Sequence, residues 1–268
     1  MRNIREVICP KDYYNKNGIL LIAKGAAISL EKLRYLEKKY QSERAKAPGP
    51  EQEKFFEHAQ KLKERYGQVN TQILDQANRL LITTIFESKQ KPWWMHINTL
   101  GNYLDWLYTH SIDVALISLM MAIELGYPEN ILLDISLGAV LHDVGKLLIP
   151  KQILQKNTAL NAQEKVIVRQ HCELGWDSVA ECSLSEVIKY IILQHHERLD
   201  GSGYPKQLHA EQISEYAKLV MIADSFDGIT AGRPYKKSKE ANEALSILKS
   251  QNEAYSKEYL KALEAILT

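Results

Sequence analysis

An apolar helical segment, residues 131–141, ends in the charged run His142-Asp143-Val144-Gly145-Lys146. Burying an imidazole, a carboxylate and an ammonium group costs free energy unless a partner compensates them. A metal ion that takes the imidazole and the carboxylate as ligands is a general way to do so. If this run stood alone, a capped helix end with a salt-bridged Asp143 would be the better explanation, and it is the rest of the chain that favours a metal ion.

Other histidines and acids repeat this placement within or at the end of apolar helical segments. One such histidine is ordinarily a hydrogen-bonded core residue, but many of them would each need a separate partner. A shared positive charge is the simpler account, so we predict a metal centre. The predicted ligands are His110, His142, Asp143, His171, His195, His196 and Asp224.

Two ions fit this ligand set better than one. Neighbouring residues on a helix point about 100° apart, so His195 and His196 cannot easily converge on a single ion. The same holds for His142 and Asp143, which makes Asp143 the natural bridge between two ions. Imidazole and carboxylate donors without a thiolate favour Fe or Mn, and leave Zn, Ni or Co open. We therefore expect two divalent metal ions as cofactors.

Paired divalent ions predict the hydrolysis of a phosphate ester. A water shared by two ions loses a proton near neutral pH, and the resulting hydroxide can attack phosphorus. Asp143 would then be catalytic as the bridging group. Lys146, three residues further along, is placed to donate to a phosphate oxygen or a leaving group. A salt bridge between Lys146 and Asp143 is the alternative.

Two further segments are candidates for substrate binding. Gly203, Tyr204 and Pro205 lie in a loop shortly after His195 and His196, where glycine permits close backbone approach and tyrosine can stack on a base. Arg233 and Lys236 follow Asp224 and could hold phosphate at the mouth of the site. An ordinary turn and a solvated basic surface are the corresponding alternatives.

The chain as a whole predicts a mainly α protein. From about residue 100 to the end, every periodic segment is helical and no strand alternation occurs, which is typical of an all-α domain. Residues 4–9 and 18–23 read as strands, Ser29 begins a short helix, and residues 44–50 resemble a linker. We divide the chain into a small N-terminal α+β regulatory module (1–48), a helical connector (49–98) and a catalytic domain (99–268).

The connector carries apolar residues in a 4,3 alternation through residues 51–88, including Phe55, Ala59, Leu62 and Tyr66. This pattern is typical of a coiled-coil seam and so predicts a possible homodimer. A long helix packed on its own domain would show the same pattern over so few heptads. Both readings stay open at this stage.

Composition indicates the cellular compartment and which kinds of binding partner are not expected. The formal net charge of +1 gives no reason to expect polymeric nucleic acid or an anionic membrane as partner. The three cysteines fit neither a disulfide framework nor a zinc ribbon, which favours a reducing compartment. We see no signal peptide or membrane span and expect a cytoplasmic protein.

The ordered ligand series resembles the HD phosphohydrolase superfamily. The motifs HDVGKLLIP (142–150), HHERLDGSGYP (195–205) and DSFDGITAGRPYKK (224–237) resemble the HD-GYP family of bacterial cyclic di-GMP phosphodiesterases. The resemblance implies an HD-type helical bundle that hydrolyses cyclic di-GMP to linear pGpG, and in some members to GMP, at an iron or manganese centre. It also implies that Lys146, Arg233 and Lys236 contact phosphate and that Gly203, Tyr204 and Pro205 line the pocket.

Three positions depart from the family pattern. Members with three metals carry a glutamate where this chain has Trp106, so we expect two metals. Leu199 replaces a common aromatic residue, and Asp113 replaces a frequent arginine. The changes at Leu199 and Asp113 motivate one alternative, a catalytically weak module that binds cyclic di-GMP or a diguanylate cyclase. A separate alternative is another HD enzyme, either a nucleotide phosphohydrolase or a di-iron oxygenase, which the Gly-Tyr-Pro loop disfavours.

Overall fold

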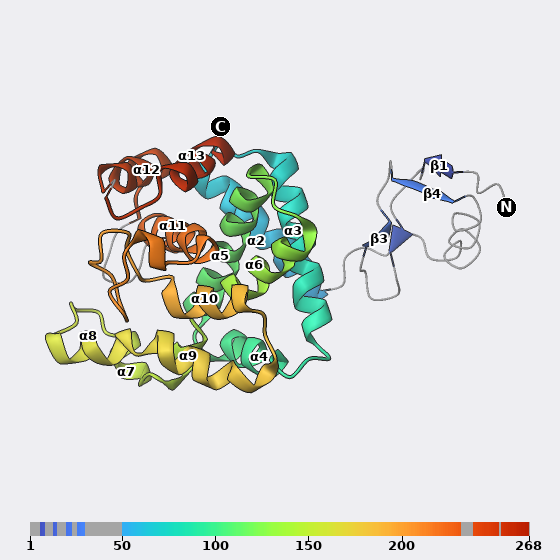
Figure 1. The fold of residues 1–268 in the computed structure, drawn as a ribbon. Coiled ribbons are helices and arrows are strands. Elements are labelled where there is room, and N and C mark those ends of the chain that lie inside the picture. Colours follow the sequence, from blue (N-terminus) through green and yellow to red (C-terminus); the bar gives the residue numbers. More distant parts are fainter. Residues whose placement is uncertain are drawn as a thin grey trace. The chain divides into compact units, whose positions relative to one another are not determined.

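The structure is a computed structural model that describes residues 6–8, 13–14, 20–22, 26–29, 50–231, 238–251 and 253–267. The chain divides into two compact units, Met1–Glu57 and His58–Thr268. Helices dominate the larger unit and short strands the smaller one, as Figure 1 shows. The predicted mainly α class with a small β-containing N-terminal module is confirmed.

The N-terminal unit contains two antiparallel strand pairs. β1 (Glu6–Ile8) pairs with β4 (Ala27–Ser29), and β2 (Tyr13–Tyr14) pairs with β3 (Leu20–Ile22). The strands predicted within residues 4–9 and 18–23 correspond to β1 and β3, whereas β2 and β4 were not predicted. β2 spans only two residues, too few to show an alternation. Ser29 ends a strand, and the helix expected after it lies outside the described residues, as does most of the expected linker.

The larger unit is built from helices joined by short connections. Its elements are α2 (Pro50–Tyr66, which begins in the N-terminal unit), α3 (Thr71–Ser88), α4 (Trp94–Tyr103), α5 (Asp105–Glu124), α6 (Glu129–Leu141), the 3-10 helix η1 (Val144–Leu148), α7 (Lys151–Leu154), α8 (Ala162–Arg169), α9 (His171–Val179), η2 (Ala180–Cys182), α10 (Glu186–Gln194), η3 (Ala210–Gln212), α11 (Glu215–Thr230), α12 (Ala241–Ser250) and α13 (Lys257–Ile266).

Helix α5 forms the centre of the larger unit. It packs against α3, α4, α6, α11 and α13, and its residues are buried on nearly all faces from Leu107 to Ala122. In Figure 1, α12 and α13 lie at one end of this unit and α7, α8 and α9 at the other. Among the described residues, α5 alone is long and apolar enough to cross a membrane, but 78% of the relevant window is buried by neighbouring helices. It is therefore a core helix by its packing.

The predicted continuous helix of residues 51–88 is wrong, because the chain breaks between α2 and α3. Gly67 has a φ of +75°, a conformation that glycine adopts readily, and the Asn70 side chain caps α3 by accepting from the Ile73 N–H. Ala59, Leu62 and Tyr66 are buried in the single chain. This burial favours packing on the chain's own domain over a dimer seam.

Helices α3 and α4 pack directly against the central helices. α3 contacts α5 and α6, and α4 contacts α5 and η1. In terms of packing, most of the predicted connector therefore belongs to the larger unit. The assignment of residues 99–268 as the catalytic domain stays a prediction.

Candidate metal centre

The seven predicted ligands gather into two neighbouring groups. The first ligand group is His110, His142 and Asp224, and the second ligand group is Asp143, His171, His195 and His196. Within each group, one possible ligand atom per residue lies within 4.8 Å of all the others. The described part of the chain thus brings together from five segments every residue that the sequence singled out as a ligand.

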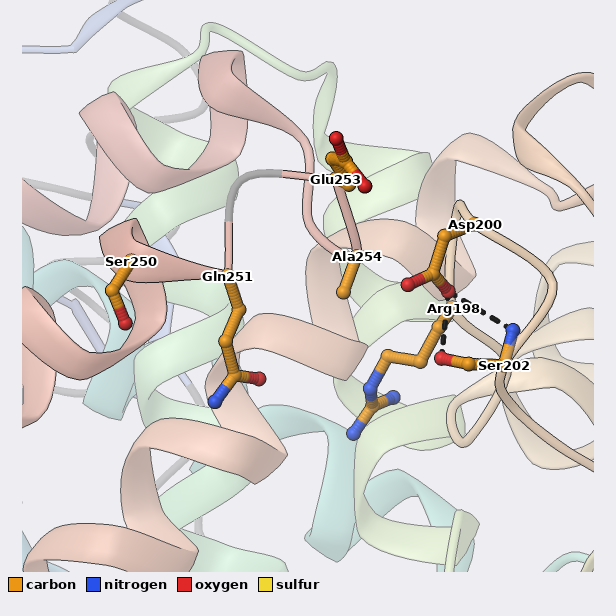
Figure 2. A pocket seen from close by; sticks show the side chains of 7 residues that line it. All are labelled: Arg198, Asp200, Ser202, Ser250, Gln251, Glu253 and Ala254. Carbon is orange, nitrogen blue, oxygen red and sulfur yellow. Dashed lines mark hydrogen bonds between the residues drawn. The ribbon is translucent and has the colours of Figure 1, made fainter.

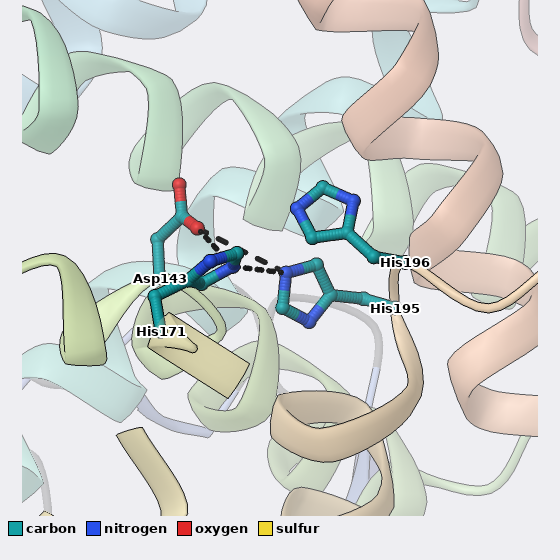
Figure 3. A group of neighbouring side chains, drawn as sticks. All are labelled: Asp143, His171, His195 and His196. Carbon is teal, nitrogen blue, oxygen red and sulfur yellow. Dashed lines mark hydrogen bonds and ion pairs between the residues drawn. The ribbon is translucent and has the colours of Figure 1, made fainter. Parts of the chain in front are cut away.

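Asp143 faces both ligand groups. Its Oδ2 atom lies 3.5 Å from His110 Nε2 and 3.4 Å from His142 Nε2. Its Oδ1 atom lies 3.3 Å from His171 Nε2 and 3.9 Å from His195 Nε2. Figure 3 shows the carboxylate directed toward His171, with His195 and His196 beyond it. This is the geometry required of a group that bridges two ions.

Three of the histidines follow the ends of helices, and this position orients their rings. The last four carbonyls of a helix lack intrahelical partners. Nδ1 of His142 lies 2.6 Å from the Ala139 carbonyl oxygen at the end of α6, and Nδ1 of His171 lies 2.7 Å from that of Val168 at the end of α8. Nδ1 of His195 lies 3.0 Å from the carbonyl oxygen of Ile192 at the end of α10. A proton donated from Nδ1 leaves Nε2 free to bind a metal.

His110 is oriented differently because it lies inside α5, where the carbonyls are already used by the helix. Its Nδ1 atom lies 2.6 Å from Oδ2 of Asp227. Asp227 comes from α11, three residues after Asp224, and its side chain is buried. Asp227 was not among the predicted site residues, although its spacing of one helical turn from the predicted ligand Asp224 was a usable signal.

Several ligand atoms are buried without a hydrogen bond among the described residues. They are His110 Nε2, His142 Nε2 and Asp143 Oδ1. His110 Nε2 lies only 3.1 Å from Asp224 Oδ1, yet the pair lacks hydrogen-bond geometry. Buried polar atoms are almost always paired in proteins. Orphaned lone pairs that point at a common centre are what a metal site requires, so the residues fit a pair of divalent ions.

Burial and neighbouring charges put several of the seven ligands in their metal-binding protonation states. Burial lowers the pKa of His171 to about 4 and holds the pKa values of His195 and His196 well below their usual range. Although burial opposes it, the Lys146 ammonium keeps the pKa of Asp143 well below its usual range. The imidazoles of His171, His195 and His196 are therefore neutral and the Asp143 carboxylate is ionised at neutral pH, as metal binding demands. His110 differs: although burial opposes it, the contacts of its ring with Asp224 and Asp227 raise its pKa to about 9, so a metal ion must displace a proton there.

A close contact of backbones brings the HD segment against the second ligand group. A Cβ atom added at Gly145 would lie 2.0 Å from the His171 carbonyl oxygen and 2.5 Å from the Gly175 nitrogen. No side chain larger than hydrogen fits between η1 and α9 without displacing one of them. Gly145 therefore sets the distance between Asp143 and His171.

The loop after α10 forms the rim of the centre. Buried Glu197 accepts hydrogen bonds from the backbone N–H groups of Lys206 at 2.6 Å and Leu208 at 3.0 Å, which closes the loop around Gly203. The Tyr204 ring stacks on the His196 ring with centroids 4.7 Å apart. The Arg169 guanidinium lies 5.0 Å from the centroid of this same Tyr204 ring. Glu197 and Arg169 were not predicted, because a single charged residue in the sequence does not indicate which group it will contact.

Of the three cationic residues predicted to contact substrate, the structure describes only Lys146. Lys146 is buried, and its Nζ atom lies 2.5 Å from Asp143 Oδ2, so the salt bridge left open by the sequence is present. Arg233 and Lys236 lie outside the described residues. Arg169, an exposed cation at the end of α8, lies beside the ring of Tyr204 in the Gly-Tyr-Pro loop.

A separate hollow of about 330 Å³ lies between this loop and the connection from α12 to α13. Figure 2 shows Arg198 projecting toward it, with Asp200, Ser202 and Gln251 nearby. The Arg198 guanidinium is anchored internally, since it donates to the Glu197 carbonyl at 2.7 Å and to Ser225 Oγ at 3.2 Å. None of the seven ligands lines this hollow. We assign Arg198 to holding the loop in place.

Residues 95–258 match the model of the HD domain, and the chain belongs to this family. The Gly-Tyr-Pro motif places it in the HD-GYP group. A solved structure of similar fold is Bd1817, an HDG"Y"P protein from Bdellovibrio bacteriovorus. It has a TM-score of 0.55 at 18% identity, and the match covers 98% of this chain and 96% of that one. At this identity, the likeness supports the fold alone.

Curated relatives match part of this chain. The chain is 35% identical to the cyclic di-GMP phosphodiesterase PA4108 of Pseudomonas aeruginosa, over 59% of this chain and 38% of that protein. It is 37% identical to a cyclic di-GMP phosphodiesterase of Thermotoga maritima, over 62% of this chain and 46% of that protein. It is 40% identical to the 3'3'-cGAMP-specific phosphodiesterase 2 of Vibrio cholerae, over 47% and 25%. The matches thus span less than half of each relative.

Proposed function

We propose that this protein is a metal-dependent phosphodiesterase that hydrolyses cyclic di-GMP to linear pGpG, with GMP as the product of a second cleavage. The observation that carries the proposal is the convergence of seven donor side chains into two neighbouring groups, with Asp143 of the second group facing both. A centre of this kind serves displacement at phosphorus, since it can hold the attacking and the leaving oxygens together. The names of the curated relatives support a cyclic dinucleotide as substrate.

In this proposal, the seven residues hold two divalent ions, Fe or Mn by the chemistry of the donors. When bound, such ions activate water and neutralise charge on the phosphate. The chain's own residues supply the rest. Asp143 fixes the spacing of the two ligand groups, and the carbonyls at the helix ends hold the imidazole rings at their angles. Lys146 supplies a buried positive charge beside Asp143 for a substrate phosphate.

The rim provides the substrate contacts. Tyr204 stacks on His196 beside the centre, and we assign its ring to contact with a nucleobase. We assign Gly203 and Pro205 to the same pocket wall, and Arg233 and Lys236 to phosphate binding. Arg169, which lies over Tyr204, is an additional cation for the substrate. We place the protein in the cytoplasm, where a cyclic dinucleotide signal would be available.

The test is product analysis with metal content measured on the same sample. Protein purified without oxygen is analysed for metals, then incubated with cyclic di-GMP, 3'3'-cGAMP and a nucleoside triphosphate, and the products are separated by chromatography. We expect two ions per chain and linear pGpG from cyclic di-GMP. The matched control is the same preparation stripped with a chelator, which should be inactive and recover when Mn or Fe is returned.

Other outcomes select the alternatives. Tight binding of cyclic di-GMP without a linear product, in a sample that holds two ions, would make the protein a binding module or a partner of a diguanylate cyclase. Cleavage of the triphosphate alone would make it another HD nucleotide phosphohydrolase. Oxygen consumption by a di-iron form with an organic substrate would select the oxygenase.

A further inference from the structure

A charged side chain from outside the family-matched region contacts the support of the metal centre. Arg65 lies in the last turn of α2, whereas the HD domain match begins at residue 95. Its Nη1 atom donates to Asp227 Oδ1 at 2.8 Å, and its Nη2 atom donates to Asp113 Oδ2 at 2.8 Å. One guanidinium therefore joins two carboxylates from different helices, α11 and α5.

The two oxygens of Asp227 serve different partners. Oδ1 accepts from Arg65, while Oδ2 lies 2.6 Å from Nδ1 of His110. The Asp227 side chain is 1% exposed, so solvent cannot replace either contact. The orientation of the carboxylate, and with it the ring of His110, depends on what holds Oδ1.

A guanidinium suits this position better than an ammonium would. Its planar fork can donate two parallel or diverging hydrogen bonds at fixed angles, whereas a lysine ammonium acts as a point charge. Asp113 is 2% exposed, so a cation is also needed to compensate a second buried carboxylate. His58 Nδ1 approaches Asp113 Oδ1 only at 3.9 Å and is a weaker partner.

We propose that Arg65 is a positioning residue for the first ligand group, which acts through Asp227 to hold His110 in its metal-binding orientation. The inference rests on the proposed role of His110 as a ligand. It makes the last turn of α2 a functional part of the metal centre. It also explains how Asp113, which departs from the family's frequent arginine, is accommodated: the cation next to it comes from another helix.

The competing account is structural, in which Arg65 only compensates the charge of Asp113. A pair of variants separates the two accounts. Arg65→Met keeps the length of the side chain but removes the charge and both hydrogen bonds. Arg65→Met combined with Asp113→Asn removes the uncompensated carboxylate as well. Lys63→Met, which removes an exposed cation two residues earlier on α2, is the matched control.

Metal affinity and the unfolding temperature are measured for each variant, with Mn titrated against a competing chelator. We expect Arg65→Met to lower both. In the double variant, the unfolding temperature should return toward that of the wild type. One of the two ions should still bind about 10- to 100-fold more weakly, because losing a hydrogen bond that supports a metal ligand has an effect of this size at other metal sites. Arg65→Lys should fall between Arg65→Met and wild type, and Lys63→Met should match the wild type.

Full recovery of metal affinity in the double variant would overturn the proposal, because Arg65 would then serve Asp113 alone. Unchanged affinity in Arg65→Met would overturn it as well. Because the readout is metal binding, it does not depend on the substrate. A wild-type protein that binds two ions but cleaves no cyclic dinucleotide would refute the proposed function and leave this inference standing. A wild type that binds no ions would refute both.

Discussion

His110 and the three histidines at helix ends reach the same centre by different means. His142, His171 and His195 are oriented by carbonyls of the turn just before them. His110, inside a helix, needs a carboxylate 117 residues away. The first arrangement uses backbone atoms that every residue carries, and the second depends on particular side chains. Helix ends therefore orient three of the histidines locally, whereas His110 is oriented only once tertiary packing has brought Asp227 beside it.

The largest effect is expected at Asp143, because its carboxylate faces both His110, which a side chain supports, and His171, which a helix-end carbonyl supports. Asp143→Asn removes a charge that faces both ligand groups and leaves Lys146 without its buried partner. We expect loss of both ions and a fall in phosphodiesterase activity of about 10³-fold or more, the scale of losing a central electrostatic group. Elemental analysis and product chromatography measure the two effects.

Asp177→Asn is the control for that change, because Asp177 is an exposed acid on α9. It should keep both ions and full activity. Retention of two tightly bound ions by Asp143→Asn would show that the two ligand groups bind independently, and Asp143 would lose its bridging role.

A smaller loss is expected when the support of His110 is changed. Asp227→Asn keeps the size of the side chain but weakens the contact with His110 Nδ1 and with Arg65. We expect one ion to bind about 10- to 100-fold more weakly while the other is retained, because outer hydrogen bonds to a ligand contribute on this scale. Titration with a competing chelator should resolve two steps. Wild-type affinity at both steps would mean that His110 needs no side-chain support.

Features that depend on neighbouring residues could be predicted from the sequence, whereas contacts between distant segments could not. Histidines that end apolar helices are visible in the sequence, and all seven predicted ligands come together. The helical class of the larger unit follows from its periodicity. Arg65 could not be found this way, because its partners lie 48 and 162 residues away and only tertiary packing brings them together. The break at Gly67 was missed because the apolar pattern continues across it.

A modest effect is expected on the substrate side of α8. Arg169 stands over the Tyr204 ring and lies two residues before His171. Arg169→Ala should raise KM for cyclic di-GMP by about two- to fivefold, the equivalent of one exposed cation–π contact, and leave the metal content unchanged. Lys165→Ala, one turn earlier on α8, is the control and should leave KM as it is. A fall in metal content in Arg169→Ala would instead assign the residue to holding His171.

The smallest effect is expected one residue earlier, at Val168. Its carbonyl oxygen lies 2.7 Å from His171 Nδ1, but that oxygen belongs to the backbone and survives any side-chain change. Val168→Ala removes part of a half-buried apolar side chain, so the free energy of unfolding should fall by only about 1 kcal/mol. Metal affinity at both steps should equal that of the wild type. Asp227→Asn, which alters the corresponding partner of His110, should weaken one step. If Val168→Ala weakened a step to the same extent, the His171 ring would depend on side-chain packing, and the contrast between the helix-end histidines and His110 would be lost.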